Sequence, residues 1–212
     1  MSRPSSSSGS TSSEWVQKKR DERIRVLIRA AAEVFARRGY EGTNMEEIGN
    51  RMGLRGPSLY HYASSKEDLF LTCVETINAE VVGRLTELAE ADGPPRERLH
   101  QLFREQVLFE TVQYRDYLPL FLQVYLPDPA LRERVAELRH LHGEIFERVA
   151  REAVASGEIS EDNWHRNLLL ATGAIAYVRD WYQPDGLETP ESLADDIATR
   201  LVSALVRGFA TD

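Results

Sequence analysis

Residues 42–62 restrict the fold of this 212-residue chain more than any other segment, because they predict two short helices joined by a tight turn. Asn44 suits the N-cap of the first helix, and Glu47 follows three residues later, as in a capping box. Gly53 would supply the turn, and Pro57 stands near the start of the second helix, where its missing N–H costs nothing. This pattern is typical of a helix-turn-helix, whose second helix enters the major groove of DNA. The alternative is two packed core helices, with Gly53 as an ordinary C-cap.

The flanking sequences also predict helices. Upstream, apolar residues from Ile24 to Phe35 recur at helical spacing, and Gly39 follows two arginines as a stop signal. Downstream, Lys66 stands in the first turn of a helix that begins after two serines. A cation there opposes the helix dipole, which favours an anionic partner such as a DNA phosphate. The alternative is an ordinary solvated lysine.

Residues 20–70 resemble the DNA-binding domain of the TetR family of one-component bacterial repressors. The resemblance rests on a series of short matches in the same order and spacing, namely Ala-Ala-x-x-Phe35, Arg-Gly-Tyr40, Gly-Thr43, Glu-Ile48, Gly53, Ser-Leu-Tyr-His-Tyr62 and Ser-Lys-Glu-Asp-Leu69. It implies phosphate contacts from Thr43, Asn44, Ser58, Tyr60, Tyr62 and Lys66. It also implies that Arg55, Gly56, Pro57 and His61 lie at or near base edges.

Two positions depart from the family pattern. Ala63 stands where the family usually has a large apolar residue, so the packing beneath the second helix would be thinner. The pair Gly56-Pro57 is also unusual, and Gly56 offers no side chain to a base. We therefore expect Arg55 to carry most of the base recognition, because arginine is the side chain best suited to a guanine edge.

The formal net charge of −8 is opposite in sign to that expected of a nucleic-acid-binding protein, but the charge is unevenly distributed. Residues 1–66 contain 12 Lys and Arg against 7 Asp and Glu, whereas residues 67–212 contain 14 against 27. The basic end is thus the expected phosphate-binding surface, and the acidic remainder favours another role. Acidic helix faces also promote solubility, which is the simpler explanation of the second half.

The chain is expected to be all-α, with about nine helices and no strands. We predict a disordered tail at residues 1–14, a three-helix helix-turn-helix domain at 15–66, and a helical ligand-binding and dimerisation domain at 67–212. Among the helix starts, Asp128 with Pro129, Ser160, and Thr189 with Pro190 are suited to capping.

Because Cys73 is the single cysteine, the chain cannot form an internal disulfide. Cys73 lies in an apolar stretch, which predicts that it is a small residue of the core. His140 and Glu144 share a helix face, but two ligands without a third are too few for zinc. No metal or cofactor is expected. The Ser-rich N-terminus lacks an apolar core and no apolar run could span a bilayer, so we expect a cytoplasmic protein.

The last two predicted helices are candidates for a homodimer interface. The first of them is apolar over more than one face, which indicates burial on several sides. The candidate interface residues are Leu168, Ala171, Ile175, Val178, Leu201 and Leu205. A monomer with both helices buried is the alternative. A two-fold dimer would set its recognition helices about 34–36 Å apart and would read a palindromic site.

Aromatic residues in the middle helices, mixed with a few polar ones such as Gln106 and His142, could line a largely apolar pocket. The candidate ligand-binding residues are Phe103, Val107, Tyr117, Phe121, Phe146, Leu170 and Tyr177. The alternative is that all of them are core residues. Residues 178–186 resemble a segment of family members that respond to acyl-CoA thioesters.

These features predict a ligand-responsive repressor that binds a palindromic operator in double-stranded DNA as a dimer and is released by a small lipophilic effector, with acyl-CoA as the suggested class. A DNA-binding regulator without an inducer is the second hypothesis. An enzyme built on a helical bundle is a remote third, because we find no nucleophile–base set, phosphate-binding loop or Glu-x-x-His motif.

Overall fold

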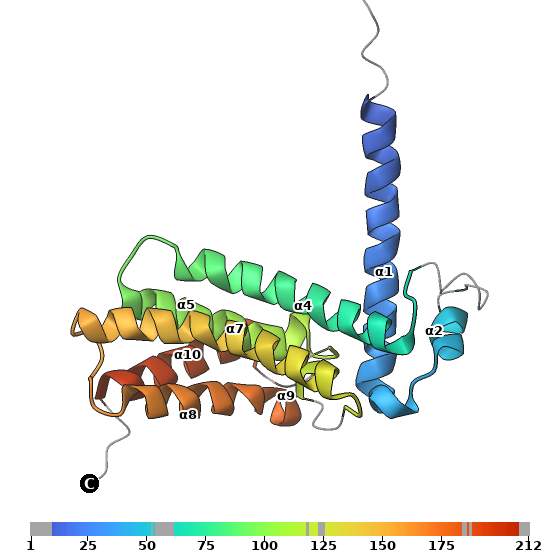
Figure 1. Ribbon diagram of the computed structural model, residues 1–212. Coiled ribbons are helices and arrows are strands. Elements are labelled where there is room, and N and C mark those ends of the chain that lie inside the picture. The colour runs from blue at the N-terminus through green and yellow to red at the C-terminus, as the bar shows by residue number, and fades with distance from the viewer. Residues whose placement is uncertain are drawn as a thin grey trace, which may run out of the picture. The chain divides into compact units, whose positions relative to one another are not determined.

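The computed structural model of the protein describes residues 10–51, 53, 62–117, 119–122, 126–183, 186 and 188–207. Every regular element in these ranges is helical, which confirms the all-α prediction (Figure 1). None of the helices in these ranges combines the length and the apolar character that a membrane crossing requires.

The chain divides into two compact units, residues 1–74 and 75–212. The first unit holds α1 (Ser10–Gly42), α2 (Met45–Arg51) and the beginning of α4 (Lys66–Ala89). The α4 helix crosses the division at Val74, so one continuous helix supplies residues to both units. The division lies eight residues beyond the predicted boundary at residue 66.

The core of the first unit is built around three aromatic rings. Phe70 makes edge contacts with Phe35 and Tyr40, each with ring centroids 5.2 Å apart. Ile48 of α2 is fully buried beside α1, as the helical spacing predicts. Cys73 is also buried, and burial raises the pKa of its thiol to about 12, in agreement with the prediction of a small core residue.

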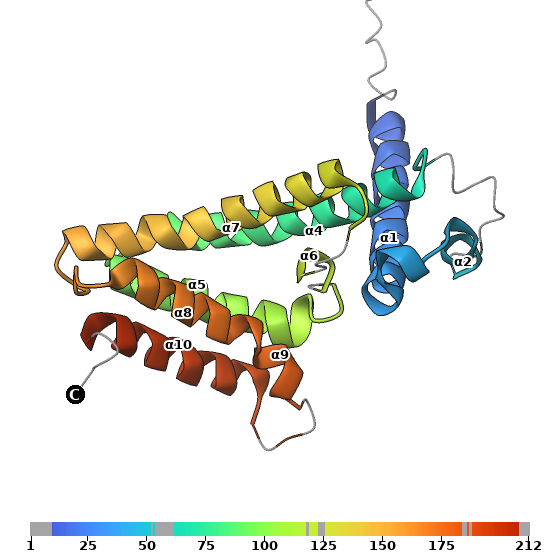
Figure 2. The ribbon, with the colours of Figure 1, turned by 60° about the horizontal axis from the view of Figure 1, so that its bottom comes forward.

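The second unit contains the remaining helices. They are the end of α4, α5 (Pro95–Leu108), the π-helical turn η1 (Phe109–Gln113), α6 (Pro119–Leu122), α7 (Pro129–Ala155), α8 (Trp164–Ala176), α9 (Val178–Trp181) and α10 (Pro190–Arg207). The α5 helix packs against α7 and α10, and these helices and α8 lie lengthwise beside one another (Figures 1 and 2). Phe103 and Phe146 stack at the centre, with ring centroids 5.8 Å apart.

The predicted number of about nine helices is corrected by the structure. Among the described residues, seven α-helices have seven residues or more, and α6, α9 and η1 are single short turns. The π-helical turn was not predicted. It continues directly from α5, and hydrophobic periodicity gives no signal for it.

Helix capping was predicted correctly at two of the three named sites in the second unit. Asp128 accepts a hydrogen bond from the Ala130 N–H at 2.8 Å, ahead of Pro129. Thr189 likewise accepts from the Ser192 N–H at 3.2 Å. The prediction for Ser160 is wrong, because α8 begins only at Trp164 after Asn163, which has a left-handed backbone.

Candidate functional sites

The start of α2 is held as predicted. The Asn44 side chain accepts a hydrogen bond from the Glu47 N–H at 2.7 Å, which confirms it as the N-cap. The neighbouring Thr43 is only 3% exposed, and its hydroxyl donates to the Gly39 carbonyl at 2.8 Å. Gly39 has a φ of 72°, which lets the chain turn back toward α2 at that point.

Lys66 links the start of α4 to the junction of α1 and α2. Its ammonium donates to the Thr43 carbonyl at 3.1 Å and lies 4.4 Å from the centre of the Tyr40 ring. The Tyr40 hydroxyl in turn donates to Glu67 at 2.6 Å and lowers the pKa of that carboxyl. An ammonium has three N–H donors, so Lys66 can hold this junction and still offer a donor to a phosphate.

The residues predicted to bind DNA fall into four groups. Asn44 and Tyr62 are exposed and accessible to a partner, Lys66 is half-buried, and Thr43 is buried with its hydroxyl already bonded. The largest group lies outside the described residues and comprises Arg55, Gly56, Pro57, Ser58, Tyr60 and His61. Ala63 is 3% exposed and so belongs to the core of this unit despite its small size.

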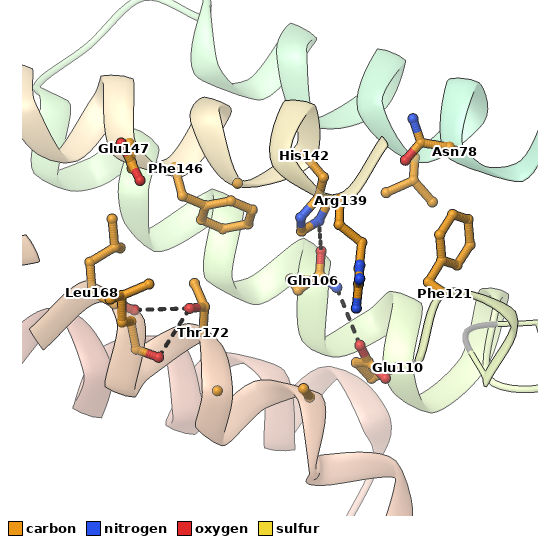
Figure 3. Close-up of a pocket in the computed structure, with 15 residues that line it drawn as sticks. Asn78, Gln106, Glu110, Phe121, Arg139, His142, Phe146, Glu147, Leu168 and Thr172 are labelled. Carbon is orange, nitrogen blue, oxygen red and sulfur yellow. Dashed lines mark hydrogen bonds between the residues drawn. The ribbon is translucent and has the colours of Figure 1, made fainter. Parts of the chain in front are cut away.

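The second unit contains a cavity of about 390 Å³ that is partly open to solvent, since Arg139 and Leu169 of its lining are exposed (Figure 3). It lies among α4, α5, η1, α6, α7 and α8. Its apolar lining includes Val81, Phe121, Phe146, Leu168, Leu169 and Ala176, and its polar lining includes Asn78, Gln106, Glu110, Arg139, His142 and Thr172. A largely apolar wall with a few converging polar groups is the usual character of a small-molecule site.

A hydrogen-bonded series of side chains crosses the polar wall. His142 Nε2 lies 2.9 Å from Gln106 Oε1, and Gln106 Nε2 donates to Glu110 Oε1 at 3.3 Å (Figure 3). Burial lowers the pKa of His142 to about 4, so the imidazole is neutral at pH 7 and donates through Nε2. Burial raises the pKa of Glu110 to about 7, although the nearby charge of Arg179 acts in the opposite direction.

No cluster of three metal-ligating side chains occurs among the described residues. His140 is exposed and pairs with Glu144 at 3.3 Å, as the sequence predicted for residues on one helix face. His142 points elsewhere and lines the cavity, where its neutral ring serves as a hydrogen-bond donor.

Comparison with known families identifies both units. Residues 27–73 match a profile described as bacterial regulatory proteins of the tetR family, and residues 92–205 match one described as a tetracyclin repressor-like C-terminal domain. The second match alone covers more than half of the chain. The protein belongs to the TetR family. TetR-family proteins are DNA-binding transcriptional regulators, which agrees with the helix-turn-helix prediction and with the expectation that the chain is not an enzyme.

The TetR-family chain is similar to several characterised proteins. It is 27% identical to the transcriptional activator FasR of Mycolicibacterium smegmatis over 74% of this chain and 69% of FasR. The structure of AibR with isovaleryl coenzyme A and operator DNA has a TM-score of 0.72 and 24% identity, covering 87% of this chain and 98% of AibR. The Bacillus subtilis regulator FadR with stearoyl-CoA has a TM-score of 0.69 and 22% identity, covering 84% and 96%.

The predicted ligand-binding residues of this TetR-family protein have different surroundings in the structure: some line the cavity, some are buried in the core and some are exposed. Phe121 and Phe146 line the cavity. Phe103 and Val107 are fully buried in the core behind it, while Tyr117 lies outside the lining and packs on Tyr114. Leu170 and Tyr177 are 55% and 70% exposed on the outer surface. Glu110, Asn78 and Arg139 were not anticipated as lining residues, because charged and amide side chains in helices usually indicate a solvated face.

Most of the predicted dimer residues are buried within the single chain. Leu168, Ala171, Ile175, Val178 and Leu205 are at most 2% exposed within one protomer, so they have almost no surface left for a partner. Leu201 alone of the set is partly exposed. An outer apolar stripe of exposed residues at helical spacing runs along α8 and α9, and it is formed by Leu170, Ala174, Tyr177 and Trp181.

Glu110 gives the protein an expected pH dependence of stability. Its pKa in the folded state, about 7, lies above the ordinary value of 4.5, so stability is lost as the pH rises through this range. The wild type should therefore lose roughly 3 kcal/mol of unfolding free energy between pH 4 and pH 8 through this group, whereas Glu110→Gln, which cannot ionise, should not show this loss. Urea denaturation of both proteins at the two pH values measures this. An equal difference at both pH values would contradict the prediction.

Proposed function

We propose that this protein is a ligand-responsive transcriptional repressor that binds a palindromic operator as a homodimer and is released by a small lipophilic effector. The observation that carries the proposal is the largely apolar 390 Å³ cavity in the second unit of a chain whose first unit belongs to a DNA-binding family. Since a repressor acts on chromosomal DNA, its expected location is the cytoplasm.

Acyl-CoA thioesters are the effector class that we would test first. The AibR and FadR structures, which share this fold, hold isovaleryl coenzyme A and stearoyl-CoA. The apolar residues on the cavity wall, among them Phe146 and Leu168, suit an alkyl chain. A regulator without an inducer remains the second candidate, because a cavity of this kind is also compatible with an unusually loose core.

Release from DNA would be a population shift. An effector can change operator affinity only to the extent that it binds the DNA-free conformation more tightly than the DNA-bound one. The α4 helix is suited to couple the two events, because it carries Lys66 at its start and contributes Asn78 and Val81 to the cavity. The relative FasR is named an activator, so a promoter reporter is needed to establish repression for this chain.

Operator binding is tested by band shift with the promoter region beside the gene. Arg55→Ala is expected to weaken binding about 5- to 150-fold, because a bidentate arginine–guanine contact is worth about 1–3 kcal/mol. Arg37→Ala is a matched control, since this exposed arginine pairs with Glu33 at 3.3 Å and its loss removes the same charge. Equal effects of the two substitutions would refute a base-reading role for Arg55.

Effector response is tested in the same assay by adding acyl-CoA thioesters of increasing chain length to the protein–DNA complex. Release of DNA at micromolar concentrations by one part of the series would support the proposal. If no acyl-CoA in the series changed DNA binding, the result would favour a regulator without an acyl-CoA effector.

A further inference from the structure

Glu110 is an unexpected residue in the wall of the cavity. It lies in η1, the π-helical turn that follows α5, and it is only 4% exposed. Carboxylates are rarely buried unless they are paired, and π-helical turns are often found at functional sites. Both features indicate that this position serves more than packing.

The hydrogen bonds of Glu110 are incomplete among the described residues. Oε1 accepts from Gln106, whereas Oε2 is buried and accepts no hydrogen bond. Figure 3 shows the carboxyl group directed toward Gln106 on the polar wall. A buried acceptor without a donor is unfavourable, so such a group calls for a missing partner. Because the terminal bond of a glutamate rotates readily, either oxygen can be turned toward a molecule in the cavity.

Arg179 is the cation with the strongest electrostatic effect on Glu110, but it does not donate the missing hydrogen bond to Glu110 Oε2. Arg179 acts on the carboxyl through its charge, yet the buried Nε and Nη1 atoms of Arg179 donate no hydrogen bond within the described part of the chain. Arg179 Nε lies 3.6 Å from the carboxylate of Asp180, beyond hydrogen-bonding distance. Arg139 places a second guanidinium in the cavity lining. Two arginines in this region oppose a ligand ammonium and leave a neutral donor as the suitable partner.

We propose that Glu110 is the polar anchor of the cavity and that the effector offers it a neutral hydrogen-bond donor, a hydroxyl group on an otherwise apolar chain. This inference rests on the proposed function and narrows the effector class. An unsubstituted acyl chain has no donor for Glu110, whereas a hydroxylated chain or a lipophilic alcohol does. The chain would then lie against the apolar wall that includes Phe146 and Leu168.

Isothermal titration calorimetry of the full-length protein with two matched pairs of probes tests the proposal at pH 8, where a carboxyl group with a pKa of about 7 is mostly ionised and can only accept hydrogen bonds. The first pair is decan-1-ol and its methyl ether, and the second is decanoyl-CoA with its 3-hydroxy analogue, which distinguishes a free alcohol from a thioester. We expect the hydroxylated member of at least one pair to bind about tenfold more tightly than its partner. Decylamine is the cationic probe, and binding tighter than that of decan-1-ol would overturn the neutral-donor assignment.

Variants of Glu110 test whether this residue causes the preference for the hydroxylated probe. Glu110→Leu should bring the preference close to onefold, while Glu110→Gln, which keeps an acceptor and the shape, should retain part of it. Glu144→Leu is the control, because Glu144 is exposed on α7, pairs with His140 at 3.3 Å and does not line the cavity. It should keep the full preference.

The outcomes separate this inference from the proposed function. Equal binding of both members of each pair to the wild type, or a preference that survives in Glu110→Leu, overturns the role of Glu110 and leaves a lipophilic effector in place. Failure of every probe to bind the wild type counts against both. If Glu110→Leu does not fold, Glu110→Gln and Gln106→Leu provide the test. The inference would be overturned if both variants kept the full wild-type preference for the hydroxylated probes.

Discussion

The double substitution Leu170→Arg and Tyr177→Arg is expected to convert the proposed homodimer into monomers. Both side chains belong to the outer apolar stripe of α8 and α9, and each is more than half exposed in the protomer. Aromatic and aliphatic anchors at the centre of an interface contribute about 2 kcal/mol or more each. Each dimer would lose four such side chains and gain four like charges, which would raise the dissociation constant at least roughly a thousandfold.

Light scattering coupled to size-exclusion chromatography measures the mass directly. Leu141→Arg is the matched control, because Leu141 is 47% exposed on α7 and lies outside the outer apolar stripe. It should leave the dimer intact. The double variant should also lose operator affinity, since a monomer reads only one half-site. A double variant that keeps the dimeric mass would show that another surface forms the interface.

Phe103→Ala is expected to destabilise the second unit by about 3–5 kcal/mol. The Phe103 side chain is fully buried on α5 and stacks on Phe146, so its removal leaves a large void between α5 and α7 that the surrounding helices can fill only in part. Because unfolding of a dimer depends on concentration, chemical denaturation followed by circular dichroism should be compared at one protein concentration.

Leu141→Ala provides the reference for this measurement. An exposed leucine usually changes stability by no more than about 0.5 kcal/mol when it is shortened. If Phe103→Ala fell within the same range, the aromatic stack would not be the centre of the core. A loss confined to effector binding, with stability unchanged, would instead place Phe103 in the cavity wall, as the sequence predicted.

The sequence predicted the features that depend on short segments. The N-caps at Asn44 and Asp128 follow from residues that bond within their own first helical turn, so no distant contact is needed to recognise them. The all-α class follows from apolar residues at helical spacing, and the basic N-terminal third follows from counting charges. The residues around Gly53 also identified the family, because their types match the family pattern in order and spacing.

The predictions failed where a residue's surroundings come from other helices. Leu168 and Leu170 are two positions apart in an apolar run, yet one is buried in the protomer and the other is exposed. A helix that is apolar on several sides has no polar face to fix its rotation, so the sequence could not separate the core side, the cavity side and the outer side of α8. Packing of α8 against α5, α7 and α10 determines that rotation.

By itself, then, the sequence determined a helical DNA-binding regulator with an N-terminal basic unit, since local hydrogen bonding and periodicity are sufficient for those features. Only the tertiary structure identified Glu110 as part of the cavity. Gln106, its hydrogen-bond partner, lies one helical turn earlier, but His142, which continues the series, comes from α7, which is distant in sequence. The tertiary structure likewise decided which apolar residues line the cavity and which face outward, since the relative rotation of packed helices arises from side-chain contacts between them.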